Sequence, residues 1–321
     1  MNSHVYVISP SGAVRDKAGL RRGVRYLEGL GLQVEMDSGA LSSHLRFAGD
    51  DASRLACLDR AIASGADWVM LSRGGYGLTR LLQQISFKRM AKAVARGTQF
   101  MGFSDFTSVQ MALLAQTGAC TWAGPSVVES FGPVDGPDDV LESCFIDVLN
   151  HRFEGTGWRQ PFEKLPSGLR YEQFHSKRLG ADASFHLKDG LVWGGNLSVL
   201  CSMLGTPYFP QVEGGFLFLE DVGEHPYRVE RLLTQLMHAG VLANQQAVLM
   251  GQFSDYRLTP HDRGYNLKTV LNWLRSQLKV PVISGLPFGH VPRKVLLPVG
   301  CLADLVVQGR EVLLLWGNDV D

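Results

Sequence analysis

Residues 98–115 read TQFMGFSDFTSVQMALLA. This stretch predicts a strand over 99–103, followed at once by a helix over 108–116 that ends before Gly118. Ser104 stands in the turn between the two. A strand that leads directly into a helix is the repeating unit of a parallel sheet, so this stretch predicts an α/β fold.

The same alternation extends outward through the first half of the chain. Short β-branched or apolar runs predict strands, and amphipathic runs closed by glycine predict helices. The predicted strands cover 4–8, 32–36 and 68–71, and the predicted helical segments cover 17–30, 51–64, 78–82 and 87–95. We therefore expect residues 1–150 to form a doubly wound parallel sheet that is covered by helices on both faces.

The pattern changes after about residue 150. Residues 151–180 contain Gly, Pro and Trp without a clean period, which is typical of a linker or crossover. Residues 181–321 contain short apolar runs and predicted helices over 227–239 and 267–278. The turn signals expected between these runs are Lys188-Asp189-Gly190, Gly194-Gly195-Asn196 and Glu213-Gly214-Gly215. The sequence thus predicts a second, β-rich α+β domain over 181–321.

Composition excludes several classes of partner. The 321 residues contain 31 Lys+Arg and 31 Asp+Glu, so no net charge attracts the chain to nucleic acid or to an anionic membrane. The five cysteines are far apart and predict free thiols in a reducing compartment. No cluster has metal-ligand spacing, and the N-terminus does not resemble a signal peptide. We expect a cytoplasmic protein without a metal or organic cofactor.

Ser104 has the placement of a nucleophile. In a strand–turn–helix element the side chain projects from the carboxyl edge of the sheet, and the helix N-terminus supplies free N–H groups that can bind an oxyanion. The motif Gly102-Phe103-Ser104-Asp105-Phe106 lacks the second glycine of G-x-S-x-G. From the pattern alone, Ser104 or Asp105 could equally be the N-cap of the helix.

Arg73-Gly74-Gly75-Tyr76-Gly77 follows another predicted strand. Its glycines allow a close approach of the backbone to a ligand or to a second loop, although a simple tight turn explains them as well. In a doubly wound sheet this loop lies at the same edge as Ser104. Arg73 could there bind a carboxylate, or it could form an ordinary salt bridge.

A nucleophilic serine needs a base, and the base needs an orienting acid. Of the nine histidines, His290 lies in the stiff segment Gly285-Leu286-Pro287-Phe288-Gly289-His290. A turn histidine without a role is the alternative. The candidate acids Glu220, Asp221 and Glu224 all follow the apolar strand 216–219, and spacing does not choose among them.

Taken together, these segments resemble the LD-carboxypeptidase family of serine peptidases. The motifs that carry the resemblance occur in order along the chain. They are Phe47-Ala48-Gly49, Ser72-Arg73-Gly74-Gly75-Tyr76-Gly77 with Arg80-Leu81-Leu82, Gly102-Phe103-Ser104-Asp105, Gly194-Gly195-Asn196-Leu197-Ser198, Leu219-Glu220-Asp221 with Pro226-Tyr227-Arg228, and Gly285-Leu286-Pro287-Phe288-Gly289-His290.

The resemblance implies a catalytic triad of Ser104, Glu220 and His290, with the serine in the first domain and the other two residues in the second. It implies an N-terminal domain like a class I glutamine amidotransferase and an active site where the domains meet. It also implies a cytoplasmic homodimer that releases terminal D-Ala from peptidoglycan tetrapeptides during murein recycling. We further expect the backbone N–H groups of Asp105 and of Gly74 or Gly75 to form the oxyanion hole.

Two other functions are compatible with the sequence. A microcin C immunity-type peptidase would use the same triad to cleave an acyl-nucleotide toxin, with Trp122 or Trp193 as candidate residues for stacking on the adenine. A catalytically silent two-domain binding protein would use the cleft without chemistry, although all three triad positions are intact.

Overall fold

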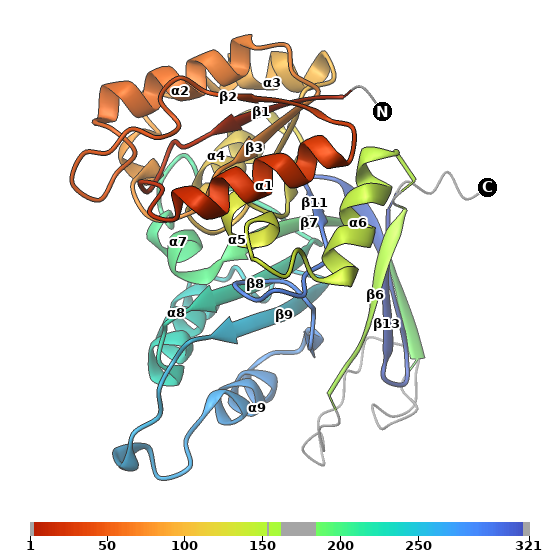
Figure 1. Ribbon diagram of the computed structural model, residues 1–321. Helices are drawn as coiled ribbons and strands as arrows, with labels where there is room; N and C mark the ends of the chain where they lie inside the picture. The colour runs from red at the N-terminus through yellow and green to blue at the C-terminus, as the bar shows by residue number, and fades with distance from the viewer. Residues whose placement is uncertain (1–2, 153, 162–183, 317–321) are drawn as a thin grey trace. The chain divides into compact units, whose positions relative to one another are not determined.

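The computed structural model describes residues 3–152, 154–161 and 184–316 (Figure 1). The chain divides into two compact units. The first unit comprises Met1–Asp147, Met203–Pro210 and Pro292–Gly300, and the second comprises Val148–Ser202, Gln211–Val291 and Cys301–Asp321. Residues 203–210 and 292–300, which were predicted to lie in the second domain, thus belong to the first unit. Most of the expected linker over 151–180 lies outside the described residues, and 155–159 form a strand.

In the described residues, the first unit contains a six-stranded sheet. Its strand order is β11-β5-β4-β3-β1-β2, and all neighbours are parallel except β11 with β5. The strands are β1 (His4–Ile8), β2 (Gln33–Met36), β3 (Trp68–Leu71), β4 (Gln99–Gly102), β5 (Thr121–Ala123) and β11 (Leu297–Val299). This confirms the predicted α/β fold and adds one antiparallel edge strand from far along the chain.

Helices connect the parallel strands. The connecting helices are α1 (Lys17–Gly29), α2 (Asp51–Ala63), η1 (Leu78–Arg80), α3 (Phe87–Ala95), η2 (Ser104–Phe106) and α4 (Thr107–Thr117). The helices α5 (Val127–Phe131) and α6 (Asp139–Leu149) follow the last parallel strand. Figure 1 shows α1 and α5 on the opposite face of the sheet from α2 and α3. The central strands β1, β3 and β4 are almost wholly buried, because both faces of the sheet are covered.

Local sequence explains where these helices begin and end. The Asp16 carboxylate accepts a hydrogen bond from the Gly19 N–H over 2.7 Å at the start of α1. Asp50 does the same for the Ser53 N–H over 2.8 Å at the start of α2. Gly118 ends α4 in the left-handed region, at a φ of 70°. These are ordinary N-caps and a glycine C-cap.

In the described residues, the second unit contains a seven-stranded mixed sheet with the order β10-β9-β8-β7-β12-β13-β6. Strands β10, β9, β8 and β7 are parallel, and β7, β12, β13 and β6 are antiparallel. Its strands are β6 (Gly155–Arg159), β7 (Ser184–Asn196), β8 (Phe216–Val222), β9 (Ala247–Ser254), β10 (Val282–Ser284), β12 (Leu302–Gln308) and β13 (Glu311–Leu315). Its helices are α7 (Leu197–Ser202), α8 (Pro226–His238), η3 (Pro260–Asp262) and α9 (Leu267–Gln277). The unit is β-rich, as predicted.

Two expected turns are wrong. Lys188-Asp189-Gly190 and Gly194-Gly195-Asn196 lie inside the long strand β7. Asp189 has a φ of 54°, near a register shift in the pairing of β7 with β12, so its turn-like sequence belongs to a bulge. A Cβ on Gly194 would lie 2.1 Å from the Phe218 carbonyl oxygen, so this glycine permits a close approach of two strands.

In each unit, the carboxyl ends of neighbouring parallel strands bring side chains from different strands close together. In the first unit, the loops that follow β1, β3 and β4 lie at the carboxyl ends of neighbouring strands, where the strand order reverses. In the second unit, Asn196 and Glu220 are paired in register near the carboxyl ends of β7 and β8. Within the described ranges, no helix of the protein is long and apolar enough to cross a membrane.

Candidate active site

Ser104 begins η2, one residue after Phe103, which separates it from the end of β4. It has a φ of 63°, which is rare for any residue other than glycine. Its neighbour Phe103 is fully extended, with a φ of −150° and a ψ of −169°. The backbone therefore reverses sharply at Ser104. Strain of this kind costs about 1–3 kcal/mol and is concentrated at functional sites.

Asp105 is buried, and its side chain does not cap the helix that contains it. Its Oδ2 accepts hydrogen bonds from the Ser11 hydroxyl and from the Leu78 N–H, the latter over 3.0 Å. Burial raises the pKa of the Asp105 carboxyl, and these two hydrogen bonds and the Arg54 charge oppose that effect. The alternative in which Asp105 is the N-cap is therefore not what the structure contains.

The loop after β3 lies against the serine. A Cβ placed on Gly74 would come within 2.8 Å of the Ser104 Cβ and 2.9 Å of its Oγ, so only glycine fits there. The Gly74 carbonyl accepts a hydrogen bond from the Gly12 N–H over 3.3 Å. In a trans peptide the Gly75 N–H then points away from Gly12.

Arg73 lies at the start of this loop and is half-buried. Its Nη1 donates to the Ala13 carbonyl over 3.3 Å, and its Nε lies 4.0 Å from Glu129 Oε1. Glu129 in turn accepts a hydrogen bond from the Ser126 hydroxyl over 3.3 Å. The guanidinium is thus loosely paired with a carboxylate of its own unit.

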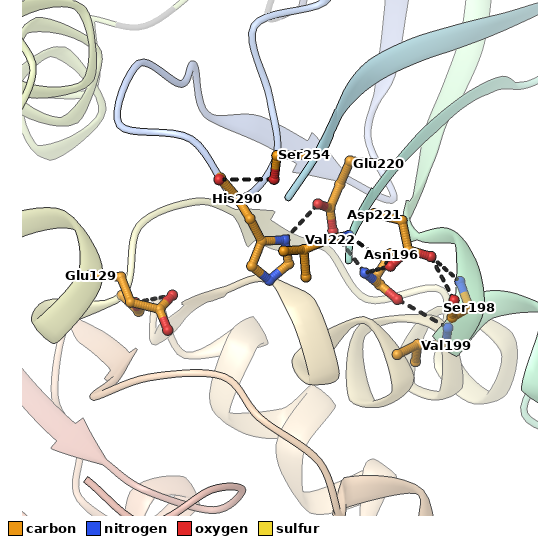
Figure 2. Close-up of polar contacts among 10 residues, drawn as sticks. Glu129, Asn196, Ser198, Val199, Glu220, Asp221, Val222, Ser254 and His290 are labelled. Carbon is orange, nitrogen blue, oxygen red and sulfur yellow. Dashed lines mark hydrogen bonds and ion pairs between the residues drawn. The ribbon is translucent and has the colours of Figure 1, made fainter. Parts of the chain in front are cut away.

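In the second unit, Glu220 and His290 are in contact although they are seventy positions apart. His290 Nδ1 lies 2.7 Å from Glu220 Oε2, and the Glu220 side chain has no exposed surface (Figure 2). A buried carboxylate on Nδ1 fixes the tautomer that leaves Nε2 as the basic nitrogen. This arrangement is typical of a general base and its orienting acid.

The backbone around His290 is attached to β9. The Gln252 N–H donates to the Phe288 carbonyl over 2.8 Å, and the Ser254 hydroxyl donates to the His290 carbonyl over 3.3 Å. Gly289 has a φ of 144°, and a Cβ there would lie 3.2 Å from Glu220 Oε2. The stiff Gly–Pro segment thus places the imidazole ring beside the carboxylate.

A second layer of polar groups holds Glu220. The Asn196 Nδ2 donates to Glu220 Oε1 over 3.2 Å and to Asp221 Oδ1 over 3.0 Å (Figure 2). Asp221 Oδ2 accepts from both the N–H and the hydroxyl of Ser198, over 2.9 and 2.6 Å. A register shift between Leu219 and Asp221 brings both consecutive carboxylates into this network.

The three candidate acids therefore have different surroundings. Glu220 contacts His290, Asp221 contacts Ser198 and Asn196, and Glu224 is paired with Arg228 on the surface. Burial and the nearby Glu220 charge raise the pKa of Asp221, and the Ser198 hydrogen bond opposes them. No role was predicted for Asn196 and Ser198 from the sequence. Their signal was the Gly-Gly-Asn run, whose Asn196 is aligned with Glu220 on the next strand.

No metal site accompanies these groups. In the part of the chain that the structure describes, no three His, Cys, Asp or Glu side chains are placed to hold a metal ion.

A histidine oriented by a buried carboxylate, in a chain of one parallel-sheet unit and one mixed-sheet unit, defines a two-domain α/β protein with a hydrolase-type side-chain pair. Models of the LD-carboxypeptidase N-terminal and C-terminal domains match residues 5–124 and 189–305. The chain belongs to the LD-carboxypeptidase family, and is thus a member of a peptidase family.

Individual relatives agree with this assignment. The crystal structure of muramoyltetrapeptide carboxypeptidase from Oxalobacter formigenes superposes with a TM-score of 0.83 at 36% identity, covering 98% of this chain and 99% of the other. A Bacillus subtilis protein named "Probable murein peptide carboxypeptidase" is 29% identical over 97% of this chain and 91% of its own length. The microcin C7 self-immunity protein of Escherichia coli has the same fold, with a TM-score of 0.81 at 22% identity over 98% of this chain and 96% of the other.

Proposed function

We propose that this protein is a serine carboxypeptidase that releases the terminal D-Ala from peptidoglycan-derived tetrapeptides. The bond cleaved would join the L-centre of the third residue to D-Ala. Family membership and the names of the relatives support the substrate class. The observation that carries the mechanism is the 2.7 Å contact between His290 Nδ1 and buried Glu220.

In this proposal Ser104 is the nucleophile. His290 Nε2 accepts the hydroxyl proton as the serine oxygen forms a bond to the scissile carbonyl carbon. His290 then gives the proton to the amine of D-Ala as the C–N bond breaks. A water molecule, deprotonated by His290, hydrolyses the ester that remains, and Glu220 stabilises the imidazolium throughout. The mechanism requires Ser104 of the first unit to act with the Glu220–His290 pair of the second.

Backbone donors would stabilise the tetrahedral oxyanion. Asp105 lies in the first helical turn after Ser104, where N–H groups lack intrahelical partners. The Gly75 N–H is directed away from Gly12 by the hydrogen bond of the Gly74 carbonyl. We propose these two groups as the oxyanion hole, since loss of one such donor typically costs about 10²–10³ in kcat.

We further propose the setting of this activity. The five cysteines are all free thiols, which fits a reducing cytoplasm and a role in murein recycling. The proposed chemistry needs only the side chains, the backbone donors and water. We also propose that the chain acts as a homodimer.

The direct test is incubation of the purified protein with a muramoyl tetrapeptide, followed by mass spectrometry. The expected product has lost one alanine.

A matched reaction with aspartyl sulfamoyl adenosine, the ligand in the microcin relative's structure, tests the immunity-type alternative. Preferential cleavage of that compound would favour the alternative. A fluorophosphonate probe tests the silent binding protein, which would leave Ser104 unlabelled.

A further inference from the structure

Two buried side chains of opposite charge, Arg54 and Asp105, bind the two ends of one peptide unit, and Asp105 is the residue after the candidate nucleophile. The Gly77 carbonyl accepts a hydrogen bond from Arg54 Nη1 over 3.0 Å. The N–H of the same peptide unit, that of Leu78, donates to Asp105 Oδ2 over 3.0 Å. Arg54 has no exposed surface and Asp105 is only 2% exposed. The peptide dipole thus lies between a cation and an anion, each aligned with its favourable end.

The same two side chains also hold the loop after β1. Arg54 Nη1 donates to the Pro10 carbonyl over 3.0 Å, and the Ser11 hydroxyl donates to Asp105 Oδ2. In each loop, one residue thus accepts a hydrogen bond from Arg54 and the next residue donates one to Asp105. This arrangement connects the loop after β1, the loop after β3 and the turn after β4 through groups with almost no access to solvent.

The connection ends at Ser104, because Asp105 is the next residue in the chain. A serine at a φ of 63° keeps that conformation only if its surroundings hold it there. The buried hydrogen bonds of Asp105 supply that constraint on one side. On the other side Gly74, three residues before Gly77, is packed directly against Ser104.

We infer that the Asp105 side chain is a positioning residue: by binding Ser11 and the Leu78 N–H, it fixes the Ser104 turn and the Gly74–Gly75 loop in one geometry. This inference rests on the proposed role of Ser104 as the nucleophile. It is separate from the proposed contribution of the Asp105 backbone N–H, which any amino acid except proline retains.

The chemistry of the contacts provides a discriminating pair of variants. Both hydrogen bonds go to the same oxygen, so the amide oxygen of Asp105→Asn can accept both, whereas Asp105→Ala loses both. A misplacement of reacting groups by 1 Å can cost about 100-fold in rate. We expect a loss in kcat of that order for Asp105→Ala with KM little changed, and substantial recovery in Asp105→Asn.

The matched control is Asp37, another buried and hydrogen-bonded carboxylate of the first unit. Its carboxylate accepts hydrogen bonds from the Tyr6 hydroxyl, Arg60 and the Gly39 N–H, none of which belongs to the loops around Ser104. Asp37→Ala should lower thermal stability without slowing the serine. Reactivity is therefore compared per folded protein, at a temperature where every variant is folded.

The experiment measures the labelling rate of Ser104 by a fluorophosphonate probe, together with kcat and KM on a tetrapeptide. Slow labelling of Asp105→Ala, recovery in Asp105→Asn and wild-type labelling of Asp37→Ala are expected. If Asp105→Ala is labelled at the wild-type rate, the positioning role of Asp105 is wrong, but the proposed serine mechanism is not affected. If wild-type protein is not labelled at Ser104, the serine mechanism fails and the inference fails with it.

If Asp105→Ala does not fold, Ser11→Ala tests the same contact from the partner's side. It removes one donor to Asp105 Oδ2 and should slow labelling by about tenfold, as expected for one lost hydrogen bond to a charged group. Labelling within twofold of wild type, in a folded Ser11→Ala protein, would contradict the positioning role.

Discussion

Asn196 and Glu220 lie side by side on neighbouring parallel strands, and the Asn196 amide donates to the Glu220 oxygen that does not face His290. Each carboxylate oxygen of Glu220 thus has its own donor. Glu220 is held from one side by an amide and uses the other to hold the imidazole.

This relationship predicts the effect of Glu220→Gln. A glutamine has one acceptor oxygen, so its NH₂ group must face either Asn196 or His290, and both of those positions carry a donor in the active tautomer. We expect kcat to fall by about 10⁴, as for the acid of a serine triad. Asp221→Asn and Glu224→Gln should be far milder, and similar losses for all three in a steady-state assay would contradict the role of Glu220.

Ser104→Ala should abolish turnover and leave the fold intact. The change removes only an oxygen, and alanine accepts the same backbone with a similar cost. Loss of a triad nucleophile typically reduces kcat by about 10⁴–10⁶. The assay is tetrapeptide hydrolysis, with circular dichroism and the melting temperature as controls. More than a tenth of wild-type activity would exclude Ser104 as the nucleophile.

The same variants test whether the two units supply one active site. If Ser104 and His290 act together, His290→Ala should cost about as much as Ser104→Ala, and the double variant little more. Kinetics of the two single variants and the double variant measure this. If the loss in kcat of the double variant equals the product of the two single losses, the two residues act independently.

Gly74→Ala should damage catalysis through sterics alone. The added methyl group would lie 2.8 Å from the Ser104 Cβ, so the serine or the loop has to move. We expect a loss of at least about tenfold in kcat, because nucleophile and oxyanion donors move apart. Gly29→Ala is a suitable control, since a Cβ there meets nothing within 4 Å. Equal activities of the two variants would contradict the close contact.

Substrate choice should depend on a free C-terminal carboxylate next to an L-centre. A cation near Ser104 would bind that carboxylate, and Arg73 is the candidate in the loop beside Ser104. Amidation of the tetrapeptide should cost about 1.5–3 kcal/mol, or roughly 10–150-fold in kcat/KM. A pentapeptide ending in D-Ala-D-Ala should also be a poor substrate. Comparable cleavage of the tetrapeptide, its amide and the pentapeptide would contradict the carboxypeptidase proposal and would be consistent only with an unspecific serine hydrolase.

Arg73→Gln should remove most of this discrimination. The control is Arg293→Gln, which alters an exposed arginine of the first unit paired with Asp138 over 3.3 Å. If Arg73→Gln still prefers the free carboxylate by the wild-type factor, another group binds it.

The pH dependence of stability should show the contribution of Asp37. Burial favours the protonated form of Asp37, but hydrogen bonds from Arg60 and the Gly39 N–H outweigh it and lower its pKa below 3.8. A lowered folded-state pKa means stability that is present above the ordinary value and lost as the pH falls through the folded value. Asp37→Asn should therefore lower the melting temperature at pH 6, and much less at a pH below the folded-state pKa of Asp37. An equal difference at both pH values would contradict this origin.

The α/β class of the first half and the turn that contains Ser104 could both be predicted from the sequence. The strand runs at 4–8, 68–71 and 99–103 are short, apolar and followed by helices. Strands that are buried on both faces of a parallel sheet have such continuous apolar sequences, so the pattern predicts them correctly. The turn at Ser104 is local too, since the strand and the helix that define it are its immediate neighbours. The stiff segment around His290 was equally evident from its glycines and prolines.

Contacts between residues that are far apart in the sequence could not be predicted and are evident only in the tertiary structure. Three carboxylates within five positions are equivalent in sequence, and the bulge at Glu220 and the loop at His290 distinguish them. The bulge at Asp189 and the pairing of β11 with β5 could not be predicted either, because both depend on a partner strand that is distant in the sequence. Register and side-chain direction arise from contacts between strands, so chain-local propensity does not specify them. Asp105 is the clearest case: its sequence indicates a helix cap, while its partners come from two other loops.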